Sequence, residues 1–144
     1  MANGVYNKGL YELAAALTDL DAADLRVLLV NGGYTFSKAH NFVADVVANE
    51  ITAAGYARQA LTGKTVTEDD TNNRAYLDAD DPVFPAMAAG ETIGGAVVFR
   101  HTGSDATAPL LFFIDVADVA TAGTAFTLTF ATGASGGVAY LYQP

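Results

Sequence analysis

The apolar positions in the first third of the chain follow mainly a helical spacing. A helix is predicted over residues 10–17 from the apolar positions Leu10, Leu13, Ala14 and Leu17. Residues 1–9 before it are short, mixed in character and contain glycines, which predicts an extended N-terminal arm. Residues 24–31 form an apolar, β-branched run that ends at a pair of glycines, which predicts a buried strand. Apolar residues at helical spacing after Ser37 predict a second short helix within residues 37–51.

Beyond Gly55 the pattern changes to short segments with strand character. Strands are predicted over residues 56–61, 64–68, 74–77, 83–87, 96–101, 110–116, 124–130 and 138–142. Thr62-Gly63, between the first two of these, predicts a hairpin or a bend. Residues 110–116 are almost continuously apolar, which is typical of a strand covered on both faces. In the last segment, alternation places Val138, Tyr140 and Tyr142 on one face.

The spacing of these segments predicts the fold class. Many short strands after a more helical N-terminal third favour a mainly β fold, either an antiparallel β-sandwich or a barrel-like domain, with one or two short helices in the N-terminal third. The sequence contains neither an internal repeat nor a linker, and 144 residues suffice for one domain with its own core. Residues 1–144 are therefore predicted to form a single domain.

Composition narrows the functions that such a domain can have. Hydrophobic residues make up 51% of the chain, which argues against disorder. No apolar run approaches the ~18 residues of a membrane span, and the first residues lack the basic and apolar regions of a signal peptide. The chain contains no cysteine, which excludes disulfides and thiolate metal sites. We therefore expect synthesis in a cytosol and no association with a membrane.

The charges are few, acidic and unevenly distributed. The chain has 16 Asp and Glu residues against 7 Lys and Arg residues, and the bases form no cluster, so nucleic acid is not an expected partner. Residues 1–81 hold twelve of the acids and six of the bases, whereas residues 82–144 hold four acids and one base. The sparse second half predicts either a solvated sheet rich in threonine or a surface that another chain covers.

An acidic stretch is the densest chemical feature of the sequence. Its members are Glu68, Asp69, Asp70, Asp78, Asp80 and Asp81. Converging carboxylates can hold Ca²⁺, but this spacing does not match an EF-hand loop, and we interpret the stretch as a solvated turn. Whether it binds a cation stays open at this point.

Other groups with chemical potential are isolated. His40 and His101 are too few for a metal site without a third ligand. His101, Ser104 and Asp105 share one turn, whereas a hydrolytic triad assembles from separate segments, and no nucleophile-elbow motif is present. The sequence therefore predicts no catalytic residues, no cofactor and no metal site, and we do not expect an enzyme.

Several segments match a known family in order along the chain. The matching stretches are residues 1–9 (Met-Ala-Asn-Gly-Val-Tyr-Asn-Lys-Gly), residues 24–30, Tyr34-Thr35, His40-Asn41-Phe42, residues 60–66, residues 78–84, residues 96–115 and residues 126–130. Together they resemble a family of small virion proteins encoded in the structural gene clusters of tailed bacteriophages. The chain departs from the family pattern at Asn7, where Asp is usual, at Phe130, where Trp is frequent, and in its last residues.

The resemblance implies a structural role in a virion, reached by assembly in the host cytoplasm. We expect a capsid decoration (cement) protein that binds the major capsid protein lattice, or copies of itself, on the outside of the head as a homo-oligomer or in many copies. The expected partner interface comprises the N-terminal residues Ala2, Asn3, Val5 and Tyr6 and the C-terminal residues Val138, Tyr140, Leu141 and Tyr142. The alternatives are a tail or neck component and, in another class, a carbohydrate-binding module for the host surface.

Overall fold

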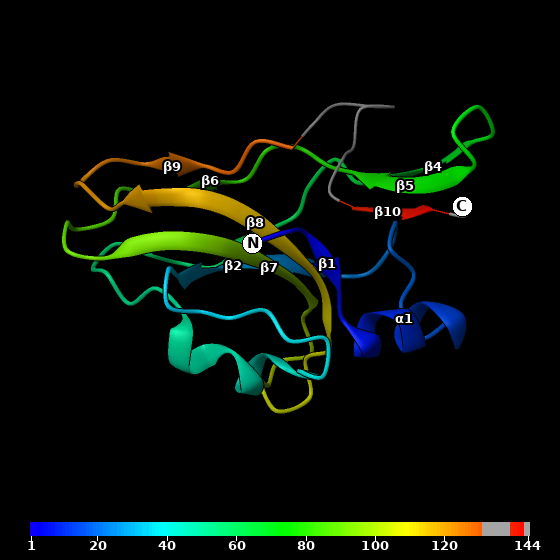
Figure 1. Cartoon of the computed structure of the whole chain (residues 1–144), viewed down its shortest axis with the longest axis horizontal. Coiled ribbons are helices and arrows are strands. Elements are labelled where there is room, and N and C mark those ends of the chain that lie inside the picture. The colour runs from blue at the N-terminus through cyan, green and yellow to red at the C-terminus, as the bar shows by residue number, and fades with distance from the viewer. Residues whose placement is uncertain (131–138, 143–144) are drawn as a thin grey trace.

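The structure is a computed structural model that describes residues 1–130 and the backbone of residues 139–142 (Figure 1). Its elements, in chain order, are β1 (Gly4–Val5), α1 (Asn7–Ala14), β2 (Leu25–Asn31), the 3₁₀ turns η1 (Val43–Asp45) and η2 (Val47–Asn49), β3 (Gln59–Ala60), β4 (Thr65–Asp69), β5 (Arg74–Asp78), β6 (Val83–Phe84), β7 (Thr92–Arg100), β8 (Leu110–Ala120), β9 (Phe126–Thr127) and β10 (Ala139–Tyr142).

A five-stranded antiparallel sheet forms the centre of the molecule, with the strand order β1-β8-β7-β2-β3. The three long strands β2, β7 and β8 are adjacent, and apolar residues face each other across them, as in the pair of Val27 and Val98. Since β-branched and aromatic residues pack well on a pleated surface, these sequences are suited to the middle of a sheet.

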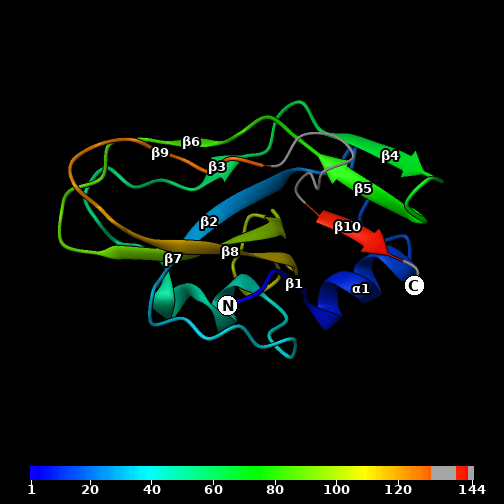
Figure 2. The same cartoon turned by 45° about the horizontal axis from the view of Figure 1, so that its top comes forward.

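Both faces of the central sheet are covered. On one face, Val27 and Val98 pack in the same cluster as Phe84 and Leu128, which come from β6 and the segment after β9. On the other face, Leu28 and Val97 share a cluster with Val43, Val46 and other residues near the 3₁₀ turns. Figure 2 shows the layers: β6 and β9 lie on one side of the sheet and the 3₁₀ turns on the other. The predicted mainly β class is confirmed, and among the described residues the antiparallel sheets do not close into a barrel.

A three-stranded sheet of order β10-β5-β4 lies at one end of the molecule, on the same side as α1 in both Figures 1 and 2. Its strands β4 and β5 form a hairpin with a regular antiparallel register. Leu77 of β5 belongs to the central core, whereas the first four residues of β4 are all exposed. The hairpin is therefore anchored through β5 and presents β4 to solvent.

The predicted N-terminal arm over residues 1–9 ends before the helix that begins at Asn7, and its extended part lies on the chain's own sheet. Gly4 and Val5 pair with Phe113 and Phe112 of β8, and α1 already begins at Asn7. The arm thus becomes an edge strand of the chain's own sheet, because this pairing satisfies backbone groups and lets Tyr6 enter the core.

The helix is present, but its position and its buried face differ from the prediction. It spans Asn7–Ala14 instead of residues 10–17, and its buried residues are Gly9 and Glu12. A side chain at Gly9 would place a Cβ atom 2.5 Å from the carbonyl oxygen of Leu111, so only glycine lets the helix lie this close to β8. With Gly9 and Glu12 inward, Leu10 points outward, and Leu17, beyond the end of the helix, is also exposed.

The second predicted helix, within residues 37–51, is replaced by the two 3₁₀ turns. The backbone N–H groups of Val43 and Ala44 donate to the carbonyl oxygens of Ala108 and Asp105, so the segment binds a neighbouring loop instead of closing helical hydrogen bonds. The Asp45 carboxylate also accepts the N–H of Asn41 at 2.7 Å.

Several strand boundaries also change. Thr62-Gly63 is a bend and not a hairpin, because β3 pairs with β2 whereas β4 pairs with β5. β7 and β8 are longer than predicted, and β6 and β9 are reduced to two residues each. The buried strand predicted over residues 24–31 is confirmed as β2.

Candidate assembly interface

The N-terminal residues expected to contact a partner are attached to the chain's own β8. The Asn3 side chain accepts the backbone N–H of Asp115 at 2.8 Å, and the Met1 amino group forms an ion pair with the Asp115 carboxylate at 2.8 Å. Ala2 and Asn3 remain exposed, and Val5 is half-buried. A contact of Ala2, Asn3 or Val5 with a neighbour stays a prediction.

Tyr6 is a different case, because it is fully buried in its own chain. Its hydroxyl lies 3.0 Å from the Tyr34 hydroxyl, which in turn lies 3.0 Å from Nδ1 of His40. Burial and the hydrogen bond with Tyr34 raise the pKa of the Tyr6 hydroxyl. The prediction that Tyr6 contacts a partner is therefore wrong: its ring fills a core that the N-terminal segment completes.

The C-terminal residues of the expected interface are only partly within the described chain. Val138 lies outside the described residues. For Tyr140, Leu141 and Tyr142 the structure gives the backbone alone, which pairs antiparallel with Tyr76, Ala75 and Arg74 of β5. One edge of this strand is thus used within the chain, and its contact with a partner stays a prediction.

Exposed apolar residues lie on the outer side of α1 and just after its end. We call Leu10, Tyr11, Ala14 and Leu17 the α1 patch. Leu10, Tyr11 and Leu17 are 48%, 55% and 52% exposed. The ammonium group of Lys8 lies 4.6 Å from the centre of the Tyr11 ring, which restrains that ring at the surface. The predicted helical face of Leu10, Leu13, Ala14 and Leu17 located three of these residues, but Leu13 packs against the core and Tyr11 lay outside the pattern.

A buried polar cluster explains why α1 faces this way. The Glu12 carboxylate accepts hydrogen bonds from Thr18 at 2.8 Å and from Arg100 at 3.0 Å, and it pairs with Lys8 at 3.2 Å. Burial raises the pKa of the Glu12 carboxyl, but the hydrogen bonds from Thr18, Lys8 and Arg100 outweigh this effect and hold the pKa below its ordinary value. Glu12 therefore anchors the inner face of the helix to β7.

The acidic stretch divides among separate local contacts. Asp69 accepts from Arg74 at 2.9 Å, Asp80 accepts from Thr62 at 3.0 Å, and Asp81 accepts the backbone N–H of Phe130 at 2.7 Å. Among the described residues, no group of three or more carboxylate or histidine side chains is arranged to hold a metal ion.

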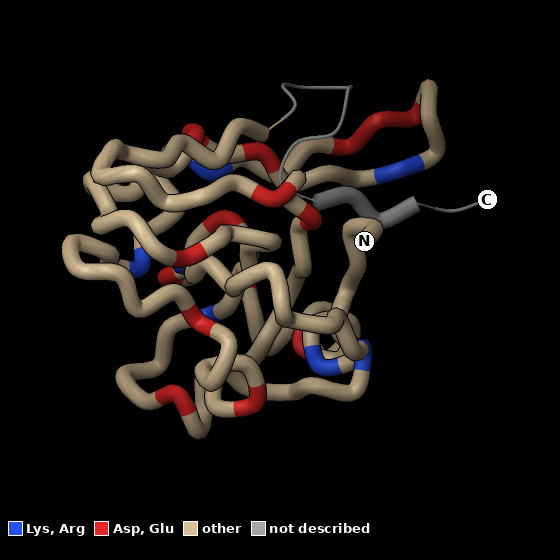
Figure 3. Tube along the Cα trace, turned by 60° about the vertical axis from the view of Figure 1, so that its left-hand side comes forward, with Lys and Arg blue, Asp and Glu red and all other residues tan. Residues whose placement is uncertain are grey.

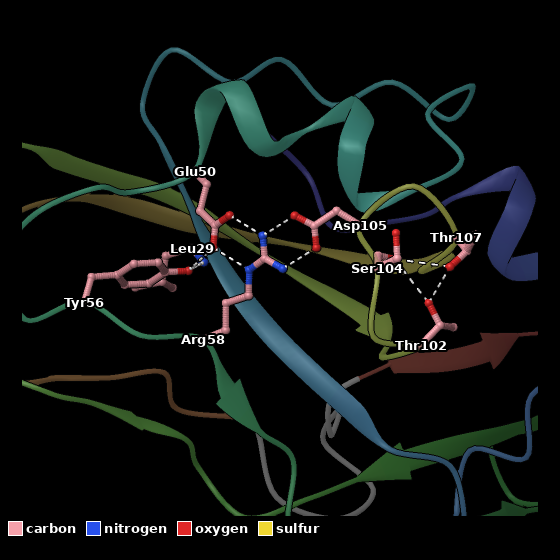
Figure 4. Close-up of polar contacts among 8 residues, drawn as sticks. All are labelled: Leu29, Glu50, Tyr56, Arg58, Thr102, Ser104, Asp105 and Thr107. Carbon is pink, nitrogen blue, oxygen red and sulfur yellow. Dashed lines mark hydrogen bonds and ion pairs between the residues drawn. The ribbon is translucent and has the colours of Figure 1, made fainter.

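An arginine clamp was missed by the sequence analysis (Figure 4). The Arg58 guanidinium binds both oxygens of Glu50, at 2.7 and 2.6 Å, and both oxygens of Asp105, at 2.6 and 2.9 Å. Tyr56 donates to Glu50 at 2.8 Å and accepts the N–H of Leu29 at 3.0 Å. Arg58 also stabilises the ionised form of Asp105 and so lowers its pKa. Since the Arg58 guanidinium binds both carboxylates, the clamp links the three segments that carry Glu50, Arg58 and Asp105.

The turn that holds His101, Ser104 and Asp105 is tied to the clamp through its aspartate. Asp105 is bound by the clamp, and the Ser104 carbonyl oxygen accepts hydrogen bonds from Thr102 and Thr107 (Figure 4). No hydrogen bond among the described residues joins His101 to Ser104 or Asp105. The clamp gave no local signal in the sequence, because Arg58 and Asp105 are 47 positions apart.

The exposed surface of residues 82–130 consists mainly of small residues. Exposed positions in residues 82–130 are almost all Ala, Gly, Ser or Thr, with the exceptions Val83, Pro85, Asp118 and Val119. Figure 3 shows the charged positions scattered along the trace, with an acidic run near the tip of the β4–β5 hairpin. In the described chain, most of the large exposed apolar side chains therefore belong to the first half, and the α1 patch is the clearest group.

No helix in the described part of the chain is long and apolar enough to cross a membrane. Comparison with protein-family models, curated proteins and solved structures finds no match to this chain.

Proposed function

We propose that the chain is a structural protein of a tailed-bacteriophage virion and acts as a capsid decoration protein. In this role it assembles in the host cytoplasm, binds the major capsid protein lattice on the outside of the head in many copies, and stabilises that lattice. The ordered motifs that resemble small virion proteins support the assignment to a virion. The observation that carries the docking role is the α1 patch.

The proposed mechanism is surface burial without chemistry. Burying one large apolar side chain contributes about 1.5–3 kcal/mol, and the α1 patch offers Leu10, Tyr11 and Leu17 together. Exposed apolar residues that cluster in this way mark interaction sites more often than isolated ones do. The formal net charge of −9 favours binding to a shell with basic patches and disfavours binding to DNA.

The test measures binding to purified heads that lack the protein. We expect the double variant Leu10→Ser/Tyr11→Ser to lose most of its occupancy on heads, because the buried apolar area is removed. Val47→Ser is the matched control, since Val47 is 42% exposed on η2, outside the α1 patch. Point variants are preferable to deleting the N-terminal residues, because a deletion would also remove β1 and the buried Tyr6.

Unchanged occupancy of the double variant, with a melting temperature like that of the control, would contradict docking through the α1 patch. Cryo-electron microscopy of virions that carry a labelled chain tests the location separately. Label on the head supports a decoration protein, whereas label confined to the tail or neck replaces the proposal with a tail component.

A further inference from the structure

The outer edge of β4 is open in the described part of the chain. β4 is the last strand in the order β10-β5-β4, so its backbone pairs with β5 on one side only. Thr65, Val66, Thr67 and Glu68 are all exposed, and Val66 is 50% exposed. Alternate residues of a strand point to opposite faces, so β4 is exposed on both faces as well as along its edge.

This edge carries few of the features that normally prevent strands from joining. Natural edge strands are protected by proline, by bulges, by charged side chains, by short length or by a covering helix or loop. β4 contains no proline, and its register with β5 runs without a shift from Thr65↔Asp78 to Asp69↔Arg74. Its Thr-Val-Thr centre also has a high preference for strands. Charge at the two ends of the strand therefore decides what can pair with it.

The sequence from Lys64 to Glu68 is complementary to itself when reversed. In an antiparallel pair of two copies centred on Val66, Val66 faces Val66 and Thr65 faces Thr67. Lys64 of each copy then faces Glu68 of the other. Apolar, hydroxyl and opposite-charge pairs across strands are each stabilising, and this register provides all three kinds.

Neighbouring registers lack this match. Centring the pair on Thr67 would place Val66 opposite Glu68, and centring it on Thr65 would place Val66 opposite Lys64. Among the described residues no ion pair includes Lys64 or Glu68, although the charge of Lys64 also acts on Asp24 and helps to lower the pKa of that carboxyl. In addition, Val66 pairs with the buried Leu77 inside the chain, so the Val66–Val66 contact would extend an apolar row across the joined sheets.

We propose that two copies of this chain associate edge to edge through β4, antiparallel and centred on Val66, so that two three-stranded sheets become one six-stranded sheet. The partner is thus a second copy of the chain, and the charge pair of Lys64 with Glu68 sets the register. This association goes beyond the decoration role and does not depend on it, because it uses the β4 edge and leaves the α1 patch free.

Sedimentation of the full chain over a range of concentrations tests the association, at about 0.15 M salt where long-range repulsion between acidic chains is screened. We expect a reversible dimer. Lys64→Glu is expected to raise the dissociation constant roughly tenfold, because two attractive pairs become repulsive. The charge-reversed double variant Lys64→Glu/Glu68→Lys is expected to restore it, since the same pairs form with exchanged signs. A monomer at every concentration, or a double variant no tighter than Lys64→Glu, would overturn the proposal.

Cross-linking tests the centre of the register independently of affinity. The chain has no cysteine, so Val66→Cys introduces a single thiol that meets its own copy at the dimer axis. Val83→Cys is the matched control, because Val83 is 55% exposed on a short strand of another sheet. We expect oxidation to link the Val66→Cys chain into covalent dimers and to leave the control monomeric. Equal cross-linking of the two variants, or none in either, would refute the centring on Val66; thermal melts confirm that both variants fold.

Discussion

β7 in the central sheet is buried from Gly95 to Phe99, whereas the first four residues of β4 in the second sheet are all exposed. Both strands contain residues that favour extended backbone, and both pair antiparallel with their neighbours. The difference comes from what lies above and below them: β7 has a core on each face, but β4 is held by β5 alone. A strand-forming sequence thus sets the conformation, and the neighbours decide whether it stabilises the fold or offers a surface.

The largest expected effect comes from emptying the central core. Phe99→Ala removes a fully buried ring and should lower the free energy of unfolding by about 3–5 kcal/mol. Val66→Ala on β4 should change the free energy of unfolding of dilute protein by less than about 0.5 kcal/mol, because that side chain is half exposed. Urea unfolding measures both variants, and equal losses would remove the distinction between the two sheets.

The next effect concerns the polar ties around the central sheet. Arg58→Met leaves the Glu50 carboxylate, whose side chain is 9% exposed, without its cation, and should cost about 2–4 kcal/mol. Arg26→Met is the control, because the exposed pair of Arg26 with Asp24 should contribute at most about 1 kcal/mol. If thermal melts show the same loss in both variants, the clamp holds the loops no better than a surface pair does.

A smaller effect is expected where α1 meets the central sheet. Glu12→Gln should lower the stability at neutral pH by about 1–3 kcal/mol, because Arg100 loses a buried charged partner. Glu68→Gln on β4, an exposed carboxylate, is the control and should change it by less than about 0.5 kcal/mol.

The lowered pKa of Glu12 also predicts how the stability of the protein depends on pH. The folded-state pKa of Glu12 lies below its ordinary value of 4.5, so its stabilisation is present above that value and is lost as pH falls through the folded pKa. Melting temperatures recorded from neutral to acidic pH should therefore fall less steeply for Glu12→Gln than for the wild type. Parallel curves would show that Glu12 is not held ionised by the fold.

The smallest effect separates the intrinsic helix preference of a residue from its contact with a neighbouring strand. Gly9→Ala should stabilise a free helix by about 1 kcal/mol. In this protein we expect it to destabilise by about 1–2 kcal/mol, because the new Cβ atom would lie 2.5 Å from the Leu111 carbonyl oxygen. Ala14→Gly, at the exposed last residue of α1, should cost less than about 1 kcal/mol by preference alone. A stabilised Gly9→Ala variant in circular dichroism melts would mean that α1 does not press on β8.

Part of the candidate interface could be recognised before the structure. The spacing of Leu10, Leu13, Ala14 and Leu17 predicted one helical face, but in the structure Leu13 packs against the core whereas the other three are exposed. Periodicity reports which residues share a face, and an amphipathic helix normally buries its apolar side. Here a glycine contact and the Glu12 cluster hold the opposite side against β8 and β7, and both depend on residues distant in the chain.

The sequence by itself determined the mainly β class, the buried strand β2 and the approximate positions of the strands, because alternation, apolar runs and turn residues are local signals. Only the tertiary structure decided which strands became neighbours, that the N-terminal segment pairs with β8, and that β4 keeps an open edge within the described chain. Contacts between distant segments decide the pairing of the strands, the Arg58 clamp and the exposure of Leu10 and Tyr11 on α1. Their energies depend on burial and geometry that no local pattern encodes.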